Sequence, residues 1–191
     1  AVGASPIMSE EESEAEELVR LASAVTINLG AVRREGWADI ETLCQAANDQ
    51  QKPLVLDPVA VGATQYRQQL NFRLLKKYHF DVIRGNLGEI AVLAGIDWQT
   101  RGIDAGNGEG DAHQVVKACA QKYHNVVIAS GATDYISDGT RVVEIHNQTR
   151  LLPAVVGSGD LLSSLAAAFC AVGPNPLQAA INASLTLSCA G

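Results

Sequence analysis

Gly157, Ser158, Gly159 and Asp160 stand directly before an apolar run, LLSSLAAAFCAV, in this chain of 191 residues. A glycine-rich turn that opens a helix presents unpaired backbone N–H groups and the positive end of the helix dipole, which together suit a phosphate. With a phosphoryl group on these amides, the carboxylate of Asp160 would be placed to take the proton of an attacking hydroxyl. Helix capping accounts for the same residues equally well, because Gly, Ser and Asp are ordinary cap residues.

Polar residues also close four predicted strands, each beside a Gly or a Pro. Asn28 precedes Leu29-Gly30, Asp57 precedes Pro58, Arg84 precedes Gly85, and Ser130 precedes Gly131. In a parallel α/β sheet the carboxyl ends of the strands lie on one edge, where ligands bind in the crevice between the loops. The sequence therefore predicts that these four side chains converge on one site.

Two of the carboxylates suggest a magnesium site. Glu89 lies three residues after Asn86 at the start of a predicted helix, so the two side chains share a helix face and could orient a hydrated ion. Asp57, at a neighbouring strand end, would supply the second carboxylate that a Mg²⁺ bridging nucleotide phosphates prefers. Each also has a purely structural explanation: Asn86 to Glu89 matches a capping box, and Asp57-Pro58 matches a turn.

Arg84 and Ser130 suit a nucleotide. A guanidinium at a strand end pairs with phosphate oxygens, although it would pair equally with one of the chain's carboxylates. Ser130-Gly131 would accept a nucleotide or form a simple turn. The sequence has no G-x-x-x-x-G-K-[ST] motif and no strand–G-x-G-x-x-G–helix pattern, which argues against a P-loop enzyme and a dinucleotide fold.

Short β-branched runs alternate with helical patterns along the chain, which predicts an α/β class with a parallel sheet covered on both faces. The predicted strands span residues 24–30, 53–59, 81–86, 125–131 and 141–147. The predicted helices include 34–49, 65–78, 87–95 and an acidic first helix over 9–24, in which Ser9 and Glu12 form a capping box. Residues 102–111 are expected to form a polar loop.

Composition excludes several classes of protein. A length of 191 residues predicts one domain, and the net charge of -7, with scattered basic residues, argues against nucleic-acid binding. The four cysteines show no C-x-x-C pair, which favours reduced thiols in the cytoplasm. No apolar run approaches 18 residues, so no membrane partner is expected.

Taken together, the motifs resemble a known family. The segments GASPIM (3–8), TINLGA (26–31), DPVAVGAT (57–64), VIRGNLGEI (82–90) and VVGSGDLLSSL (155–165) occur in the order found in hydroxyethylthiazole kinases, which belong to the ribokinase-like superfamily. The resemblance implies a three-layer α/β/α sandwich with a mostly parallel central sheet. It also implies ATP- and Mg²⁺-dependent phosphorylation of the hydroxyl of 4-methyl-5-(2-hydroxyethyl)thiazole in thiamine biosynthesis and salvage, by a homotrimer with sites at the subunit interfaces.

The resemblance implies a role for each matching residue. Substrate contacts are expected from Met8 and Gly157, with Asn28 close to the pocket, and ATP contacts from Arg84 and Ser130. The metal would be served by Asp57 and Glu89, the anion hole formed by Gly157, Ser158 and Gly159, and the general base provided by Asp160. With sites at subunit interfaces, Met8 would serve the site of a neighbouring subunit.

The chain departs from the family in two respects. Many members carry Cys where this chain has Asp160, and a carboxylate is already ionised at pH 7, whereas an unperturbed thiol is mostly protonated. The family's segments before GASPIM and after LTLSCAG are missing, so the single kinase domain over 1–191 is expected to lack terminal parts.

Three other functions remain open at this point. The ADP- or ATP-dependent dehydratase that repairs hydrated nicotinamide nucleotides shares a G-x-G-D motif but lacks GASPIM and DPVAVGAT. A hydroxymethylpyrimidine kinase shares fewer of these segments. A thiazole- or nucleotide-binding regulator on the same fold would have no need for a base at Asp160.

Overall fold

The structure is a computed structural model that describes residues 2–9, 11–97, 108–146, 152 and 155–190, with the backbone alone described at 108–111. Its strands form one six-stranded sheet in the order β1-β2-β3-β4-β5-β6, in which β1 to β4 are parallel and β5 and β6 are antiparallel. The strands are β1 (Val25–Asn28), β2 (Leu54–Asp57), β3 (Val82–Asn86), β4 (Val126–Ser130), β5 (Thr133–Ser137) and β6 (Val142–His146). The predicted α/β class with a mostly parallel sheet is confirmed.

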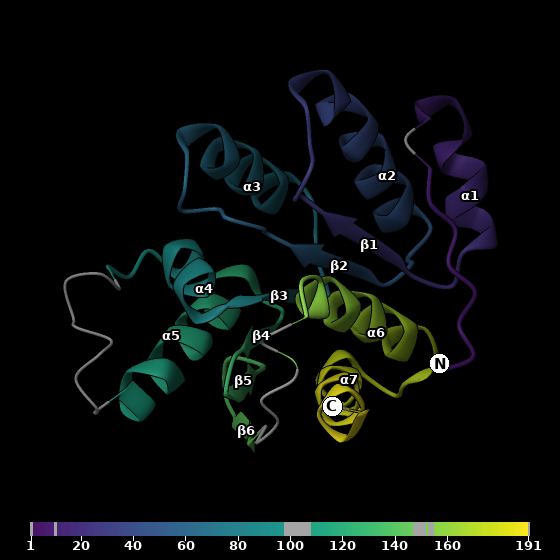
Figure 1. Cartoon of the computed structure of the whole chain (residues 1–191). Coiled ribbons are helices and arrows are strands. Elements are labelled where there is room, and N and C mark those ends of the chain that lie inside the picture. Colours follow the sequence, from purple (N-terminus) through teal and green to yellow (C-terminus); the bar gives the residue numbers. More distant parts are fainter. Residues whose placement is uncertain (1, 10, 98–107, 147–151, 153–154, 191) are drawn as a thin grey trace.

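Helices cover both faces of the sheet, which gives three layers (Figure 1). One face carries α6 (Ser158–Val172) over β1 to β3 and α7 (Pro176–Ala190) over β4 to β6. The other face carries α2 (Trp37–Asp49), α3 (Gln65–Lys77), α4 (Leu87–Ala94) and α5 (Gly108–Tyr123), while α1 (Ala15–Leu21) packs against α2. Two short 3-10 segments, Glu12–Glu14 and Arg34–Gly36, lead into α1 and α2.

Alternate residues of each parallel strand enter different cores. Leu54, Leu56 and Ile83 belong to the core beneath α2 to α5, whereas Val55 and Val82 belong to the core beneath α6 and α7. All five are fully buried, as expected for a parallel sheet with both faces covered. Because side chains alternate with a period of two, Asp57 and Arg84 must lie on the α6 side.

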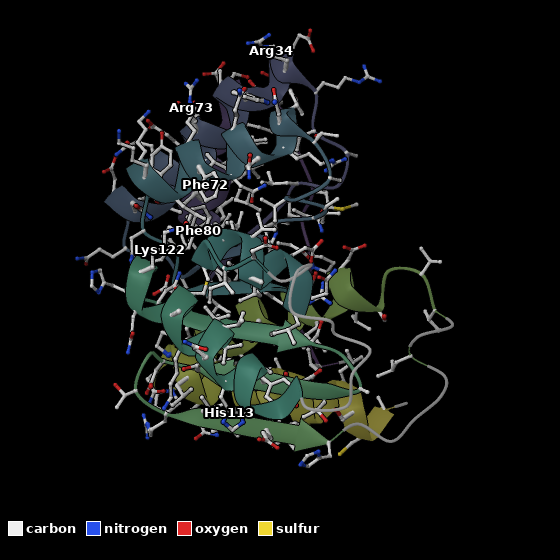
Figure 2. All side chains as sticks on the ribbon, turned by 90° about the vertical axis from the view of Figure 1, so that its left-hand side faces the viewer. Arg34, Phe72, Arg73, Phe80, His113 and Lys122 are labelled. Atoms are coloured by element: carbon white, nitrogen blue, oxygen red, sulfur yellow. The ribbon has the colours of Figure 1, made fainter. Side chains whose placement is uncertain are left out.

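Lys122, near the end of α5, connects this helix to α3. Its ammonium group lies 5.5 Å from the ring centre of Phe72 and 5.2 Å from that of Tyr123, and it donates a hydrogen bond to the carbonyl of Leu93. Figure 2 shows Lys122 beside Phe72 and Phe80 on one side of the molecule. The cation–π contact with Phe72 ties α5 to α3, and the hydrogen bond to Leu93 ties α5 to α4.

Some predicted local features differ from the structure. The acidic segment does not use a Ser9–Glu12 capping box, because Glu11 is the N-cap residue and its carboxylate accepts from the backbone N–H of Ser13. Residues 108–111 begin α5, while the rest of the predicted loop, 102–107, lies outside the described residues. The strand β5 was not predicted. Within the described residues, no helix has the length and apolar character needed to cross a membrane.

Candidate active site

The site begins with four side chains that close neighbouring parallel strands. Asn28 pairs in register with Asp57 across β1 and β2, and Asn86 pairs with Ser130 across β3 and β4. Arg84 lies two residues before Asn86. The predicted convergence of Asn28, Asp57, Arg84 and Ser130 on one edge of the sheet therefore agrees with the strand register.

A buried hydrogen-bonded cluster joins Asp57, Arg84 and Ser130 to helix α6. Arg84 Nη1 donates to Asp57 Oδ2 at 3.4 Å, and Arg84 Nη2 donates to Ser130 Oγ. Ser163, on the second turn of α6, donates to the same Asp57 oxygen at 2.7 Å. Asp57 is only 1 % exposed, yet its Oδ1 has no hydrogen-bond partner among the described residues, and neither has Nε of Arg84. The cluster therefore keeps one acceptor, Asp57 Oδ1, and one donor, Arg84 Nε, without a partner in the described part of the chain.

The predicted anion turn opens α6. Gly157 is the N-cap residue with φ 91°, a left-handed conformation that glycine adopts without strain, and no side chain of the described residues caps the helix. A Cβ atom added at Gly159 would overlap the guanidinium of Arg84. Arg84 thus lies directly against the first turn of α6, where its charge adds to the positive end of the helix dipole.

Asn28 holds the candidate base. Its Nδ2 donates to Asp160 Oδ1 at 2.9 Å, while its Oδ1 accepts from the backbone N–H of Gly30 at 2.8 Å. Asp160 is the third residue of α6 and is exposed, so its carboxylate is open to an incoming substrate. Asn28 was predicted to lie near the substrate, and the contact that the structure gives it is with Asp160.

Glu89 forms the capping box that the sequence offered as one of its two explanations. Its Oε2 accepts from the backbone N–H of Asn86 at 2.8 Å, and Asn86 Oδ1 accepts from the backbone N–H of Glu89 at 2.9 Å. Glu89 Oε1 also accepts from the N–H of Ala60 at 2.6 Å, in the loop after β2. Glu89 therefore links the loop after β2 to the start of α4.

Burial sets the electrostatics of the cluster. Burial raises the pKa of Asp57 above its ordinary value, although the hydrogen bond from Ser163 and the charge of Arg84 act in the opposite direction. The charges of Glu89 and Asp160 raise the pKa of Asp57 further, which places all three carboxylates within electrostatic reach of one another. A site with this excess of acidic groups favours a cationic partner.

Asp134 is a buried carboxylate that the sequence analysis did not select. It lies at the start of β5, is 4 % exposed, and accepts from the backbone N–H of Gly131 at 3.0 Å. Burial raises its pKa, while Gly131, Ser184 and the charge of Arg84 lower it. Asp134 therefore fixes the turn that follows Ser130 and gives Arg84 a second acidic neighbour.

The sequence analysis also did not select Ser163, which bonds Asp57, or Arg67, which bonds the loop after Asn28. Each residue is unusual for its position in a helix. Ser163 is a fully buried hydroxyl in an apolar helix, where serine requires a polar partner. Arg67 lies in the first turn of α3, the end of a helix at which a cation is unfavourable. In both cases the sequence itself contained the sign: a polar or charged residue at a helix position where that residue type is energetically unfavourable.

Met8 does not join the cluster within one chain. It lies in the extended segment before α1 and is 95 % exposed, and neighbouring Ile7 is 64 % exposed. The role implied for Met8 in a neighbouring subunit's site stays a prediction.

Comparison with known proteins identifies the family. A model of the hydroxyethylthiazole kinase family matches the chain over residues 1–191. The chain belongs to the hydroxyethylthiazole kinase family. The hydroxyethylthiazole kinase of Pediococcus pentosaceus is 74% identical over 191 residues, which cover 100% of this chain and 72% of that protein. The hydroxyethylthiazole kinase of Levilactobacillus brevis is 58% identical over 191 residues, which cover 100% of this chain and 73% of that protein.

Solved structures agree with this assignment. The hydroxyethylthiazole kinase protein of Pyrococcus horikoshii OT3 superimposes with a TM-score of 0.87 and 37% identity, covering 97% of this chain and 69% of that one. The pyridoxal kinase of Staphylococcus aureus, in complex with pyridoxal, gives a TM-score of 0.69 at 21% identity, covering 93% of this chain and 64% of that one. The latter likeness shows the ribokinase-like fold alone. The chain is a kinase, a phosphotransferase, and the dehydratase and regulator interpretations are set aside.

Proposed function

We propose that this member of the hydroxyethylthiazole kinase family transfers the γ-phosphoryl group of ATP to the hydroxyl of 4-methyl-5-(2-hydroxyethyl)thiazole. The observation that supports it most directly is the position of the Asp160 carboxylate. Asn28 Nδ2 donates to Asp160 Oδ1 at 2.9 Å, in the first turn of α6. The guanidinium of Arg84 lies against Gly159 in the same turn. A base and an anion site thus lie within one helical turn.

Asp160 acts as the general base in this proposal. The substrate oxygen attacks the γ-phosphorus, its proton passes to the Asp160 carboxylate, and the bond from the γ-phosphorus to the bridging oxygen breaks to release ADP. Such general-base help is typically worth about 10²- to 10⁴-fold in rate. The exposure of Asp160 leaves its carboxylate free to meet the substrate hydroxyl.

The first turn of α6 and Arg84 stabilise the charge that the transfer moves. The first turn of α6 would offer the γ-phosphoryl group the positive end of the helix dipole, and Arg84, which lies against Gly159, would add a permanent positive charge beside it. Because Asp57 and Ser130 already hold the guanidinium, it does not have to be ordered when the nucleotide binds. Arg84 and Ser130 are the proposed ATP contacts, and Gly157, Ser158 and Gly159 are the proposed anion hole. The Ser158 N–H donates to the carbonyl of Val155 at 3.2 Å, so a phosphate would have to share or replace that bond.

The carboxylates of the cluster suit a hydrated magnesium ion. Asp57 Oδ1 is buried and without a partner among the described residues, so one hard oxygen ligand is available. Glu89 keeps lone pairs beyond its bonds to Ala60 and Asn86. No group of three His, Cys, Asp or Glu side chains in the described part of the chain forms a complete metal cage. In this proposal Asp57 and Glu89 would hold Mg²⁺ together with waters and phosphates, and the ion would neutralise β- and γ-phosphate charge.

The remaining parts of the proposal concern substrate and setting. Gly157 and, from a neighbouring subunit, Met8 would contact the thiazole, which requires a homotrimer with shared sites. The exposed position of Met8 and Ile7 supports such an arrangement, because an apolar segment in this position gains from a partner surface. The reaction would serve thiamine biosynthesis in the cytoplasm, where the four free cysteines stay reduced.

The test is ADP release from ATP, Mg²⁺ and the thiazole alcohol by the wild type and by Asp160→Asn. We expect turnover to fall about 100-fold or more, as expected for loss of a general base. Asp39→Asn is the matched control, because Asp39 occupies the same third position in α2 and removes the same helix-dipole contribution. Full activity of Asp160→Asn would contradict the general-base role and leave Asp160 as a first-turn helix residue. ADP release that does not depend on the thiazole alcohol would contradict the proposed substrate.

A further inference from the structure

Arg67 binds the backbone of two loops that border the site. Its Nη1 donates to the carbonyl of Leu29 at 2.6 Å and to that of Val59 at 3.1 Å, and its Nη2 donates to the carbonyl of Gly30 at 2.8 Å. These carbonyls belong to the loops that follow β1 and β2, directly after Asn28 and Asp57. Among the described residues Arg67 has no carboxylate partner, so its charge is directed entirely at these carbonyls.

One peptide group carries this interaction towards the candidate base. The carbonyl of Leu29, which accepts from Arg67, and the N–H of Gly30, which donates to Asn28 Oδ1 at 2.8 Å, are the two ends of the same peptide unit. A cation at the carbonyl polarises the peptide and strengthens its N–H as a donor, as expected for chains of hydrogen bonds.

The N–H of Gly30 then decides which way the Asn28 amide points. Because a backbone N–H only donates, the atom of Asn28 that faces it must be the oxygen, and the nitrogen is turned to Asp160 Oδ1 at 2.9 Å. The approach needs glycine, since a Cβ at Gly30 would lie 2.9 Å from Asn28 Oδ1. A continuous chain of hydrogen bonds therefore runs from the Arg67 guanidinium to the Asp160 carboxylate.

We infer that Arg67 is a positioning residue for catalysis, which acts on Asp160 through the Leu29–Gly30 peptide and the amide of Asn28. The inference rests on the proposed role of Asp160. It accounts for a cation in the first turn of α3, where the helix dipole opposes it. It also changes the role of Asn28 from a substrate contact to the side chain that aims the base.

The alternative is that Arg67 only ties two loops together. Both explanations predict some loss of stability when Arg67 is replaced, so stability does not separate them. They differ in kinetics, because a residue that acts through Asp160 has no effect once Asp160 is gone, whereas a loop tie matters in either background.

The experiment is a pair of double-mutant cycles, Asn28→Ala with Asp160→Ala and Arg67→Lys with Asp160→Ala, with kcat and KM for both substrates measured in each variant. With Asp160 present, we expect Asn28→Ala to lower kcat about 10- to 100-fold, the range for a hydrogen bond to a charged group, and Arg67→Lys to lower it about 5- to 10-fold. We expect KM to change less than about twofold in both variants. In the Asp160→Ala background the same changes should alter kcat by less than about twofold.

Arg73→Lys is the matched control, since Arg73 is a second arginine of α3 that pairs with Glu41 and is 55% exposed. It should leave kcat unchanged in both backgrounds. Equal losses of kcat in both backgrounds would overturn the inference while leaving the role of Asp160 intact. A kcat unaffected by Asp160→Ala alone would overturn the proposed role of Asp160 as general base together with this inference. Should Arg67→Lys fail to fold, Arg67→Gln takes its place in the same cycle, because its amide can still donate to the loop carbonyls while the charge is removed.

Discussion

Two Asp–Arg pairs in this molecule have opposite properties. Asp57 and Arg84 meet at 3.4 Å with side chains 1% and 13% exposed, and each keeps a polar atom without a partner in the described structure. Asp138 and Arg141 meet in the turn between β5 and β6 with side chains 23% and 70% exposed. There Oδ2 of Asp138 accepts from both Nε and Nη2 of Arg141, and Oδ1 accepts from two backbone N–H groups.

The pKa values of the two carboxyl groups move in opposite directions. Burial raises the pKa of Asp57, whereas hydrogen bonds from the backbone and side chain of Arg141 lower the pKa of Asp138 to about 2. A pair that serves the fold is saturated with donors and open to water. The Asp57–Arg84 pair, for which we propose a role in binding ligand, is buried, incompletely bonded and held in place by the rest of the structure.

The largest expected effect is that of Asp57→Asn on activity. We expect kcat/KM to fall by about 100- to 1,000-fold, the size seen when one preorganised electrostatic contact is lost. The free energy of unfolding at pH 7 should change less than the activity, because removing a buried carboxylate whose pKa is raised in the folded state offsets the loss of a counter-ion for Arg84. Denaturant unfolding beside kinetics measures both, and a less stable but active variant would contradict the comparison.

Arg84→Lys should come next. A lysine cannot contact Asp57 and Ser130 together while lying flat against Gly159, so we expect kcat/KM for ATP to fall about 10- to 100-fold. Steady-state kinetics at varied ATP would show the loss. Arg141→Lys is the control from the other pair and should leave the kinetics unchanged; equal losses in the two variants would remove the distinction between the pairs.

Ser163→Ala tests the hydroxyl that supports Asp57. We expect a loss of kcat/KM of about tenfold, corresponding to one hydrogen bond to a charged group. Since this bond lowers the pKa of Asp57, its removal should raise that pKa and move the acid limb of the pH profile to higher pH. Ser164→Ala is the control, because among the described residues the Ser164 hydroxyl bonds its own helix, at the Asp160 carbonyl. A shift of the limb in both variants would contradict the assignment.

The smallest effect belongs to Asp138→Asn. At pH 7 it should lower the free energy of unfolding by about 0.5–1 kcal/mol, the range for an exposed ion pair, and leave activity unchanged. Because the folded pKa of Asp138 is lowered, this stabilisation is present above the unfolded value near 3.8 and is lost as the pH falls through about 2. Unfolding curves from pH 7 to pH 2 would show the difference shrinking, and a constant difference would refute it.

The strand ends were predictable because parallel strands bring their carboxyl ends to one edge. Asn28, Asp57, Arg84 and Ser130 each follow a β-branched run and precede a Gly, a Pro or a residue beside one, and these signals lie within a few residues of each other. Each strand end can therefore be recognised from a few consecutive residues, without knowing which strands are neighbours in the sheet.

The supporting contacts were not predictable in this way. Ser163 and Asp57 are 106 residues apart, and the partner of a buried hydroxyl is decided by how α6 lies on the sheet. The strand β5, residues 133–137, was missed because it carries Asp134, a residue type depleted in strands, and follows β4 after only two residues. The Ser9 cap failed because several acidic residues compete for the same free N–H groups.

The alternation of side chains along β1 to β4 has a consequence for folding. Asp57, Arg84 and Ser130 face α6, while the adjacent positions of their strands face the apolar core beneath α2 to α5. A slip of one residue in the pairing of any of these strands would turn its polar end into that core, where a charge has no partner. The side chains proposed to bind the nucleotide and its metal would therefore also disfavour misaligned strand pairings while the sheet assembles, so that one set of groups would serve both the proposed site and the choice of register.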